Sequence, residues 1–356
     1  MIRRASKKTI AVIIFFTAVL FLNNFSFFPV GANSLDYAIF FNGTGTNQKD
    51  RIKIPLTDQQ GQSLPVNVGM DFTVEFWLKG FLADNKSTSA NCGGYNWIHG
   101  NIIADRDIYG AGDYGDWGVS VHNGKVRFGV GDQSSDQTIC GQTNILDGNW
   151  HHLAVTRRTD NGRMAIFIDG QLTASGTGPV GNISYRAGRL TNWPQTDPYL
   201  VLGAEKHDAG TAYPSFKGWF DEFRLSNVVR YNENFQRPET PFTSDSQTVL
   251  LYHLNQGGGT GEIIQDESGY GITGDLKEGS VWRVSDSPLT TAVVSPTLFY
   301  LRGDVNRDGR VDRFDALLIF QNFGRETFSL TGYWDPLADN RVAAMDFSFV
   351  LNDWQK

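Results

Sequence analysis

Long apolar segments, cysteines and basic charge are all scarce in this sequence of 356 residues. Beyond the apolar run at residues 10–22, no segment is apolar for long enough to cross a bilayer. The formal charge is −7, and removing residues 1–32, which carry four basic residues and no acidic one, takes it to −11. We therefore expect no binding of nucleic acid or of an anionic membrane surface through charge.

The N-terminus has the layout of a secretory signal. Basic residues precede the apolar run, Asn23 and Asn24 interrupt it, and Val30-Gly31-Ala32 places small residues as a cleavage site requires. We expect cleavage after Ala32 and a secreted mature chain with no membrane span. An uncleaved N-terminal anchor is the alternative.

The two cysteines, Cys92 and Cys140, both lie in segments rich in Gly, Ser and Asn. An isolated pair in an exported chain usually forms one disulfide, which would here tie two loops together. Two free thiols are the alternative. With no histidine at ligand spacing, the pair does not form a zinc site.

Common catalytic strings are also missing. There is no Gly-x-Ser-x-Gly elbow, no HExxH and no phosphate-binding glycine loop. His151 and His152 are neighbours on a predicted strand, so they point to opposite faces and cannot chelate one ion. The same argument separates Asp221 from Glu222. We assign no catalytic residue, and the sequence argues against an enzyme.

Glycine, with 39 residues, and aromatic residues, at 13%, are plentiful, which favours an all-β chain with many turns. Residues 150–156 and 164–168 alternate around Asp160-Asn161-Gly162 and predict a hairpin. A second hairpin is predicted to turn on Asn123-Gly124. Further strands are predicted at 37–41 with 51–54 as its partner, at 72–78 with one solvated face, and at 102–104, 199–204, 218–230 and 249–254.

The string GNWHHLAVT, the turn at IFIDG and the later GWFDEFRL resemble the laminin-G-like, concanavalin A-like family. The resemblance implies an all-β, antiparallel jelly-roll β-sandwich over residues 33–283. Glycoside hydrolases of this fold class carry E-x-D-x-x-E on one strand, and that string is absent here. Laminin-G-like domains often hold an ion near a loop rim. The side chains that could bind such an ion here do not follow a recognisable ligand spacing, so we favour solvated acidic loops. These side chains are Asp105, Asp107, Asp113, Asp116, Asp208 and Asp221.

A calcium loop is the most specific chemical signal in the chain. Counted from Asp304, oxygen-bearing side chains fall at positions 1, 3, 5, 9 and 12, with Gly309 at the sharp turn of position 6. This spacing wraps six to eight oxygens around one Ca²⁺ ion. The predicted ligands are Asp304, Asn306, Asp308, Arg310 through its carbonyl, Asp312 and Asp315.

The loop and the amphipathic helix predicted after it resemble a dockerin repeat, the calcium module that docks onto cohesin domains. This assigns residues 299–356 to a small α-helical dockerin-like module and residues 284–298 to a Ser/Thr/Pro-rich linker. In the second repeat, residues 334–354, Leu337, Asn340 and Ala343 replace the expected ligand, glycine and ligand. A second ion is therefore not predicted. The resemblance implies a cohesin-like partner, and docking in cis is the alternative.

Loop aromatics lie among Gly, Asn and Asp, a mixture suited to stacking on sugar rings or to capping the sandwich ends. The candidate glycan-binding side chains are Tyr95, Trp97, Tyr114, Trp193 and Tyr213. The leading hypothesis is a secreted, non-catalytic module that binds a glycan or a glycosylated surface. An extracellular adhesion protein, and a polysaccharide-degrading enzyme with unrecognised catalytic residues, are the alternatives.

Overall fold

The structure is a computed structural model that describes residues 36–44, 50–87, 91–108, 115–186, 193, 195–256, 263–277 and 280–289. The predicted signal segment, the calcium loop with its six ligands, and the linker beyond Leu289 lie outside these residues. No helix in the described part of the chain is long and apolar enough to cross a membrane.

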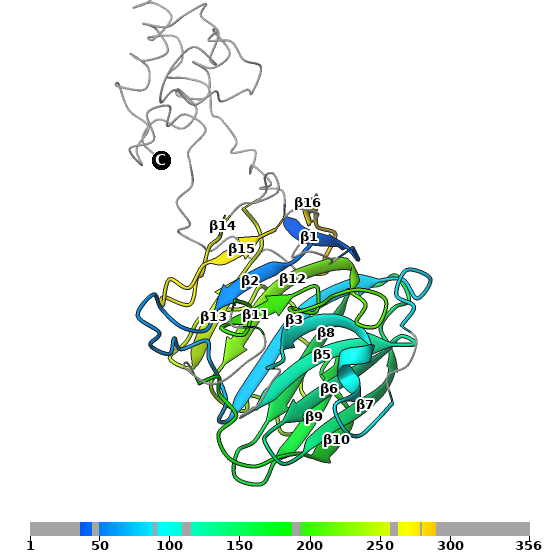
Figure 1. Ribbon diagram of the computed structural model, residues 1–356. Helices are drawn as coiled ribbons and strands as arrows, with labels where there is room; N and C mark the ends of the chain where they lie inside the picture. Colours follow the sequence, from blue (N-terminus) through cyan, green and yellow to red (C-terminus); the bar gives the residue numbers. More distant parts are fainter. Residues whose placement is uncertain are drawn as a thin grey trace, which may run out of the picture. The chain divides into compact units, whose positions relative to one another are not determined.

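Two eight-stranded sheets face each other and form an antiparallel β-sandwich of the jelly-roll type, as predicted (Figure 1). We call the first sheet A; its central strands are β3 (Phe72–Gly80), β12 (Lys217–Ser226) and β8 (His151–Arg157). The other strands of sheet A are β9 (Arg163–Ile168), β10 (Gln171–Thr177), β1 (Tyr37–Asn42), β16 (Val281–Val284) and β13 (Thr248–Tyr252), which pairs with β12.

The second sheet, sheet B, runs in the order β14-β15-β2-β11-β4-β5-β6-β7. Its strands are β14 (Ile263–Ile264), β15 (Gly274–Leu276), β2 (Ile52–Pro55), β11 (Tyr199–Leu202), β4 (Asn101–Arg106), β5 (Asp116–His122), β6 (Lys125–Gly131) and β7 (Asp136–Asn144). A short 3₁₀ helix, η2 (Asn96–His99), packs on β5 and β6.

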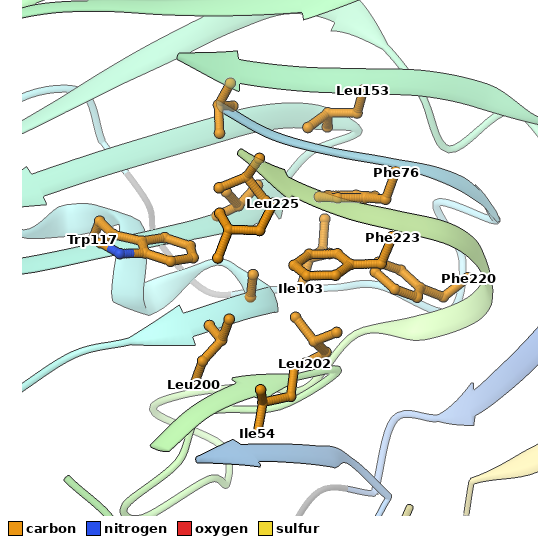
Figure 2. Packing of buried hydrophobic residues seen from close by; sticks show 14 of the residues in the cluster. Ile54, Phe76, Ile103, Trp117, Leu153, Leu200, Leu202, Phe220, Phe223 and Leu225 are labelled. Atoms are coloured by element: carbon orange, nitrogen blue, oxygen red, sulfur yellow. The ribbon is translucent and has the colours of Figure 1, made fainter. Parts of the chain in front are cut away.

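The core lies between the sheets and is built from the alternate residues that each strand turns inward. Figure 2 shows Phe76, Phe220 and Phe223 of sheet A above Leu202 and Ile103 of sheet B. The rings of Phe76 and Phe220 lie 4.9 Å apart. Each fully buried side chain of this kind contributes about 1.5–3 kcal/mol. This core fixes the ends of the strands, where the loops emerge.

Both predicted hairpins are present. β8 pairs with β9, and β5 pairs with β6. Asn123 and Gly124 have φ of 49° and 75°, the left-handed values that a two-residue hairpin turn needs. Asp169 and Gly170 adopt the same conformation, with φ of 49° and 78°, between β9 and β10.

Two predictions about the strands were wrong. The predicted partner of β1 was the segment that forms β2, but β1 pairs with β12 and β16, and β2 lies in the other sheet against β11 and β15. Strand β3 has no solvated face, because residues 227–247 cover the outer side of sheet A with Tyr231, Phe235 and Phe242. Local alternation cannot show that a distant segment covers a strand.

The sandwich continues into the segment assigned to the linker. After β16, the Ser285 N–H donates to the Asp36 carbonyl at 2.8 Å, and the Ser285 hydroxyl donates to Asp221 at 3.1 Å. Leu289 is buried with Trp77 and Trp150. Residues 284–289 therefore belong to the sandwich.

Cys92 and Cys140 form a disulfide, with Cα atoms 5.7 Å apart. Cys140 lies inside β7 rather than in a loop, so the bond ties the segment before η2 to an outer strand of sheet B. Thr138 of β7 supports the same segment, because its hydroxyl donates to the Gly94 carbonyl at 2.7 Å.

Candidate functional site at one rim of the sandwich

Three side chains from two neighbouring loops converge at the end of sheet B. Asp107 follows β4, while Glu205 and His207 follow β11, and β4 and β11 are paired. His207 Nδ1 lies 3.1 Å from Glu205 Oε1 and 3.4 Å from Asp107 Oδ2. The donor atoms of Asp107, Glu205 and His207 all lie within 4.8 Å of one another, close enough to bind one metal ion. We call these three residues the rim cluster.

The ring of His207 is held from behind by a buried carboxylate. Its Nε2 lies 2.8 Å from Oδ1 of Asp197, which is fully buried. The other ring nitrogen therefore faces Asp107 and Glu205. A carboxylate that orients an imidazole in this way is a common support for histidines that contact ions.

Asp105 ties the two loops together. Its Oδ1 accepts a hydrogen bond from the Asp107 N–H at 2.6 Å, and its Oδ2 accepts one from the Lys206 N–H at 2.8 Å. Glu205 stabilises its own loop, because its Oε2 accepts the N–H of His207 at 2.8 Å. The rim cluster is thus held in place by hydrogen bonds to the backbone.

The site concentrates negative charge in a buried setting. Burial, together with the charges of Glu205 and Asp107, raises the pKa of Asp105 to about 7. Burial alone would lower the pKa of His207, but its hydrogen bonds to Asp107, Asp197 and Glu205 outweigh burial and raise the pKa to about 11. Burial lowers the pKa of Lys206, which donates to the carbonyls of Asp197 and Tyr199 at 3.1 Å.

Of the five predicted aromatic residues, Trp193 contacts the rim cluster, and Tyr213 and Tyr95 both contact His99. The Trp193 ring stacks on His207 with centroids 5.5 Å apart, and Trp193 is 37% exposed. Tyr213 stacks on His99 with centroids 5.5 Å apart, and Tyr95, which is 58% exposed, lies 6.1 Å from the same histidine. Burial, together with the charges of Asp208, Glu205 and Asp107, raises the pKa of Tyr213.

The other two predicted aromatics are not part of this surface. Trp97 is 3% exposed, and a Cβ added at Gly118 or Gly129 would lie within about 2 Å of its ring atoms. The indole therefore fills a slot above β5 and β6 and does not reach a ligand at the surface. Tyr114 lies outside the described residues.

The expectation of solvated acidic loops was wrong for Asp105 and Asp116. Asp105 is fully buried, and Asp116 is buried and accepts the N–H of Ile108 at 2.7 Å. Asp107 is partly exposed and belongs to the rim cluster, whereas Asp208 is exposed, as expected for a solvated loop. Asp113 lies outside the described residues.

Sequence reasoning did not single out Glu205 or His207. Two segments each carry two potential ligand side chains two positions apart, Asp105 with Asp107 and Glu205 with His207. The spacing alone did not predict the cluster, because residues 206–208 form a bend and not an extended strand. The pairing of β4 with β11 then brings the two pairs together, and that pairing is not visible locally.

The carboxylates of sheet A lie elsewhere and are covered. Glu75 is fully buried; its Oε1 accepts two bonds from Arg224, and its Oε2 accepts the Tyr231 hydroxyl at 2.9 Å. His152 is fully buried against the same carboxylate, and His151 is partly exposed, as the alternation of the strand predicted.

Asp221 and Glu222 do not face opposite ways as predicted. The register of β12 shifts between Asp221 and Arg224, and Glu222 has a φ of 50°. This bulge leaves both carboxylates buried, and both interact with Asp36. Glu222 accepts the Phe242 N–H at 2.8 Å and lies 2.7 Å from His253 Nδ1.

Comparison with known families identifies the class of protein. Residues 47–234 match the family described as the concanavalin A-like lectin/glucanases superfamily, so the chain belongs to that family. Residues 302–353 match the dockerin type I domain, a calcium-binding module that binds cohesins. The suspected arrangement of a laminin-G-like domain followed by a dockerin module is therefore confirmed.

Among curated proteins, the chain is similar to the sushi, von Willebrand factor type A, EGF and pentraxin domain-containing protein 1 of Rattus norvegicus and of Mus musculus. The identity is 30% over 161 residues for the rat protein and 31% over 162 residues for the mouse protein, in each case 44% of this chain. The matched segment spans 4% of the length of each relative.

Among solved structures, the chain is similar to a Bacteroides ovatus protein with a TM-score of 0.47 and 15% identity, over 72% of this chain and 62% of that one. A pentraxin from Limulus polyphemus has a TM-score of 0.36 and 20% identity, over 56% and 79%. The CBM40 module of a Ruminococcus gnavus sialidase has a TM-score of 0.36 and 16% identity, over 55% and 92%.

Proposed function

We propose that the protein is a secreted carbohydrate-binding module whose sandwich binds a glycan at the rim and whose dockerin module attaches it to a cohesin-bearing partner. The observation that carries the proposal is the exposed Trp193 ring stacked on His207 of the rim cluster, together with Tyr213 and Tyr95, which flank His99.

The chemistry of the rim matches that of a sugar. Pyranose rings offer apolar C–H faces that stack on aromatic side chains, and their hydroxyls need fixed polar partners. The rim presents the exposed ring of Trp193 against His207, and the side chain of Asp107 in the same cluster is 22% exposed. Because Glu205 already accepts two backbone N–H groups and Asp197 already holds His207, little ordering is needed on binding.

The tail supports the second half of the proposal. Asp304, Asn306, Asp308, Asp312 and Asp315 follow the spacing of an all-oxygen calcium loop, within the residues that match the dockerin family. We propose that they bind one Ca²⁺ ion, with the Arg310 carbonyl as a further ligand. Folding of such a small module depends on its ion, so cohesin binding should require Ca²⁺.

A binding panel tests the glycan half. The purified full chain is mixed with insoluble and soluble polysaccharides, and bound protein and released reducing sugar are measured on the same samples. Retention on at least one polysaccharide, without sugar release, is expected. Sugar release would favour the polysaccharide-degrading enzyme, and retention on no glycan would favour the adhesion protein.

Calorimetry tests the tail. The chelated full chain is titrated with Ca²⁺, and the same titration is run on Asp308→Ala. We expect the heat of the dockerin loop in the parent and its loss in the variant. Equal heats in the two proteins would show that these carboxylates do not hold the ion.

A further inference from the structure

The rim cluster differs in its donor atoms from the site that a calcium ion requires. Ca²⁺ takes six to eight oxygen ligands. Here one of the three donors is the imidazole nitrogen Nδ1 of His207. Glu205 cannot bind an ion with both of its oxygens, because Oε2 accepts the backbone N–H groups of His207 and Asp208. Two single carboxylate oxygens and a nitrogen are a poor set for Ca²⁺.

The same atoms suit an ion that accepts imidazole and takes the place of the Nδ1 proton of His207. Zn²⁺ is bound by histidine nitrogen and carboxylate oxygen at about 2.0–2.2 Å, and sites with three protein ligands leave one position open. Neighbouring ligands of a tetrahedral ion with such bonds stand about 3.3–3.5 Å apart. The separations of 3.1 Å and 3.4 Å between Nδ1 and the two carboxylate oxygens are close to this spacing.

Residues around the rim cluster hold its three side chains in position through hydrogen bonds. Asp197 holds Nε2 of His207 at 2.8 Å and so directs Nδ1 at the two carboxylates. Asp105 positions both ligand loops through the N–H groups of Asp107 and Lys206. Support of this kind fixes the tautomer and the orientation of a metal-binding histidine.

We infer that Asp107, Glu205 and His207 form a binding site for a divalent ion of the zinc class, which accepts an imidazole ligand, and not for Ca²⁺. The site is distinct from the calcium loop at residues 304–315 in position along the chain and in donor type. An open coordination position beside Trp193 would let the ion contact a bound glycan; only this last point rests on the proposed function.

The test is a Zn²⁺ titration of the chelated full chain in a saturating excess of Ca²⁺, which fills the dockerin loop. Uptake of one equivalent of Zn²⁺ is expected despite the Ca²⁺. Co²⁺ serves as a spectroscopic probe, because strong visible absorption reports a tetrahedral site and weak absorption an octahedral one. His207→Gln and Asp107→Asn should lose this uptake. Asp197→Asn should bind about 10- to 100-fold more weakly with the same stoichiometry.

His122→Gln is the matched control, because His122 lies at the end of β5 with Ser87 and Asn123 as its partners. It should bind Zn²⁺ as the parent does, and circular dichroism shows which variants fold. If excess Ca²⁺ prevents Zn²⁺ uptake, the cluster is a calcium site. If the parent takes up no Zn²⁺, or if folded His207→Gln and Asp107→Asn retain it, the inference is wrong. Glycan binding does not enter these readouts, so they are independent of the proposed function.

Discussion

His207 Nε2 lies 2.8 Å from the buried Oδ1 of Asp197, and the opposite face of the rim cluster carries Asp107 and Glu205. This contact fixes the orientation of the His207 ring in the loop after β11, so that Nδ1 faces Asp107 and Glu205. Without it, the imidazole could turn away, and the two carboxylates would face each other without a partner between them. Trp193 therefore stacks on an imidazole whose orientation is fixed by hydrogen bonds.

We predict that loss of the disulfide lowers the free energy of unfolding by about 2–4 kcal/mol, because the bond closes a loop with a sequence separation of 48. Urea denaturation of Cys92→Ala/Cys140→Ala against the parent measures the difference. A reductant should shift the parent to the midpoint of the double variant and leave the double variant unchanged. Identical midpoints for the two oxidised proteins would contradict the prediction.

We predict that Glu75→Gln destabilises the sandwich by about 3–5 kcal/mol, because it leaves the Arg224 guanidinium buried without its counter-charge. Chemical denaturation checks this. Asp160→Asn is the control, because Asp160 pairs with Arg158 at the surface and its loss should change the stability little. Equal effects of the two substitutions would mean that the buried pair carries no special weight.

We predict that Asp221→Asn gains stability relative to the parent as the pH rises through the window between the ordinary aspartate pKa of 3.8 and the raised pKa of Asp221. Burial, with the nearby charges of Glu222 and Asp36, raises the pKa of Asp221 well above its ordinary value. In that pH window the folded protein holds a proton that the unfolded chain has lost, so the parent loses up to about 1.4 kcal/mol per pH unit through this group. Thermal unfolding of both proteins across the window gives the difference, which should be flat if Asp221 ionises normally.

We predict that Gly129→Ala costs about 1–3 kcal/mol, because its Cβ would lie 1.8 Å from Cδ1 of Trp97 and force the ring out of its slot. Thermal unfolding measures the cost, and the near-ultraviolet circular dichroism of the indole reports the movement. Gly61 has open space around it but a φ of +76°, so Gly61→Ala would add backbone strain and cannot serve as the control. Ala174→Gly on β10, which removes a Cβ from a partly buried strand position, shows the effect of a simple glycine exchange.

The sequence was informative where the physical cause is local. Asn123-Gly124 predicted its hairpin because a two-residue turn needs positive φ at both positions, and Asn followed by Gly adopts these values readily. It was uninformative where the cause is distant. Trp97 and Trp193 both lie in segments of the sequence rich in polar residues, yet Trp97 is buried and Trp193 is exposed, because Gly118 and Gly129 on two later strands leave room for the Trp97 ring.

The rim cluster shows the same limit. Its acidic residues were visible along the chain, but whether they are solvated or gathered depends on the pairing of β4 with β11. The covering of sheet A depends likewise on residues 227–247, which lie well over a hundred positions after β3. A turn depends on residues that are neighbours in the sequence, whereas the rim cluster depends on residues that are distant in the sequence.

The central claim is that the aromatic rim binds a glycan, and the affinity of Trp193→Ala for the polysaccharide that retains the parent tests it most directly. Tyr270→Ala is the matched control, because Tyr270 is an exposed aromatic residue in the turn between β14 and β15. Loss of the Trp193 ring should weaken binding by about tenfold or more, and Tyr270→Ala should bind as the parent does. Equal affinity of folded Trp193→Ala and the parent would contradict the account.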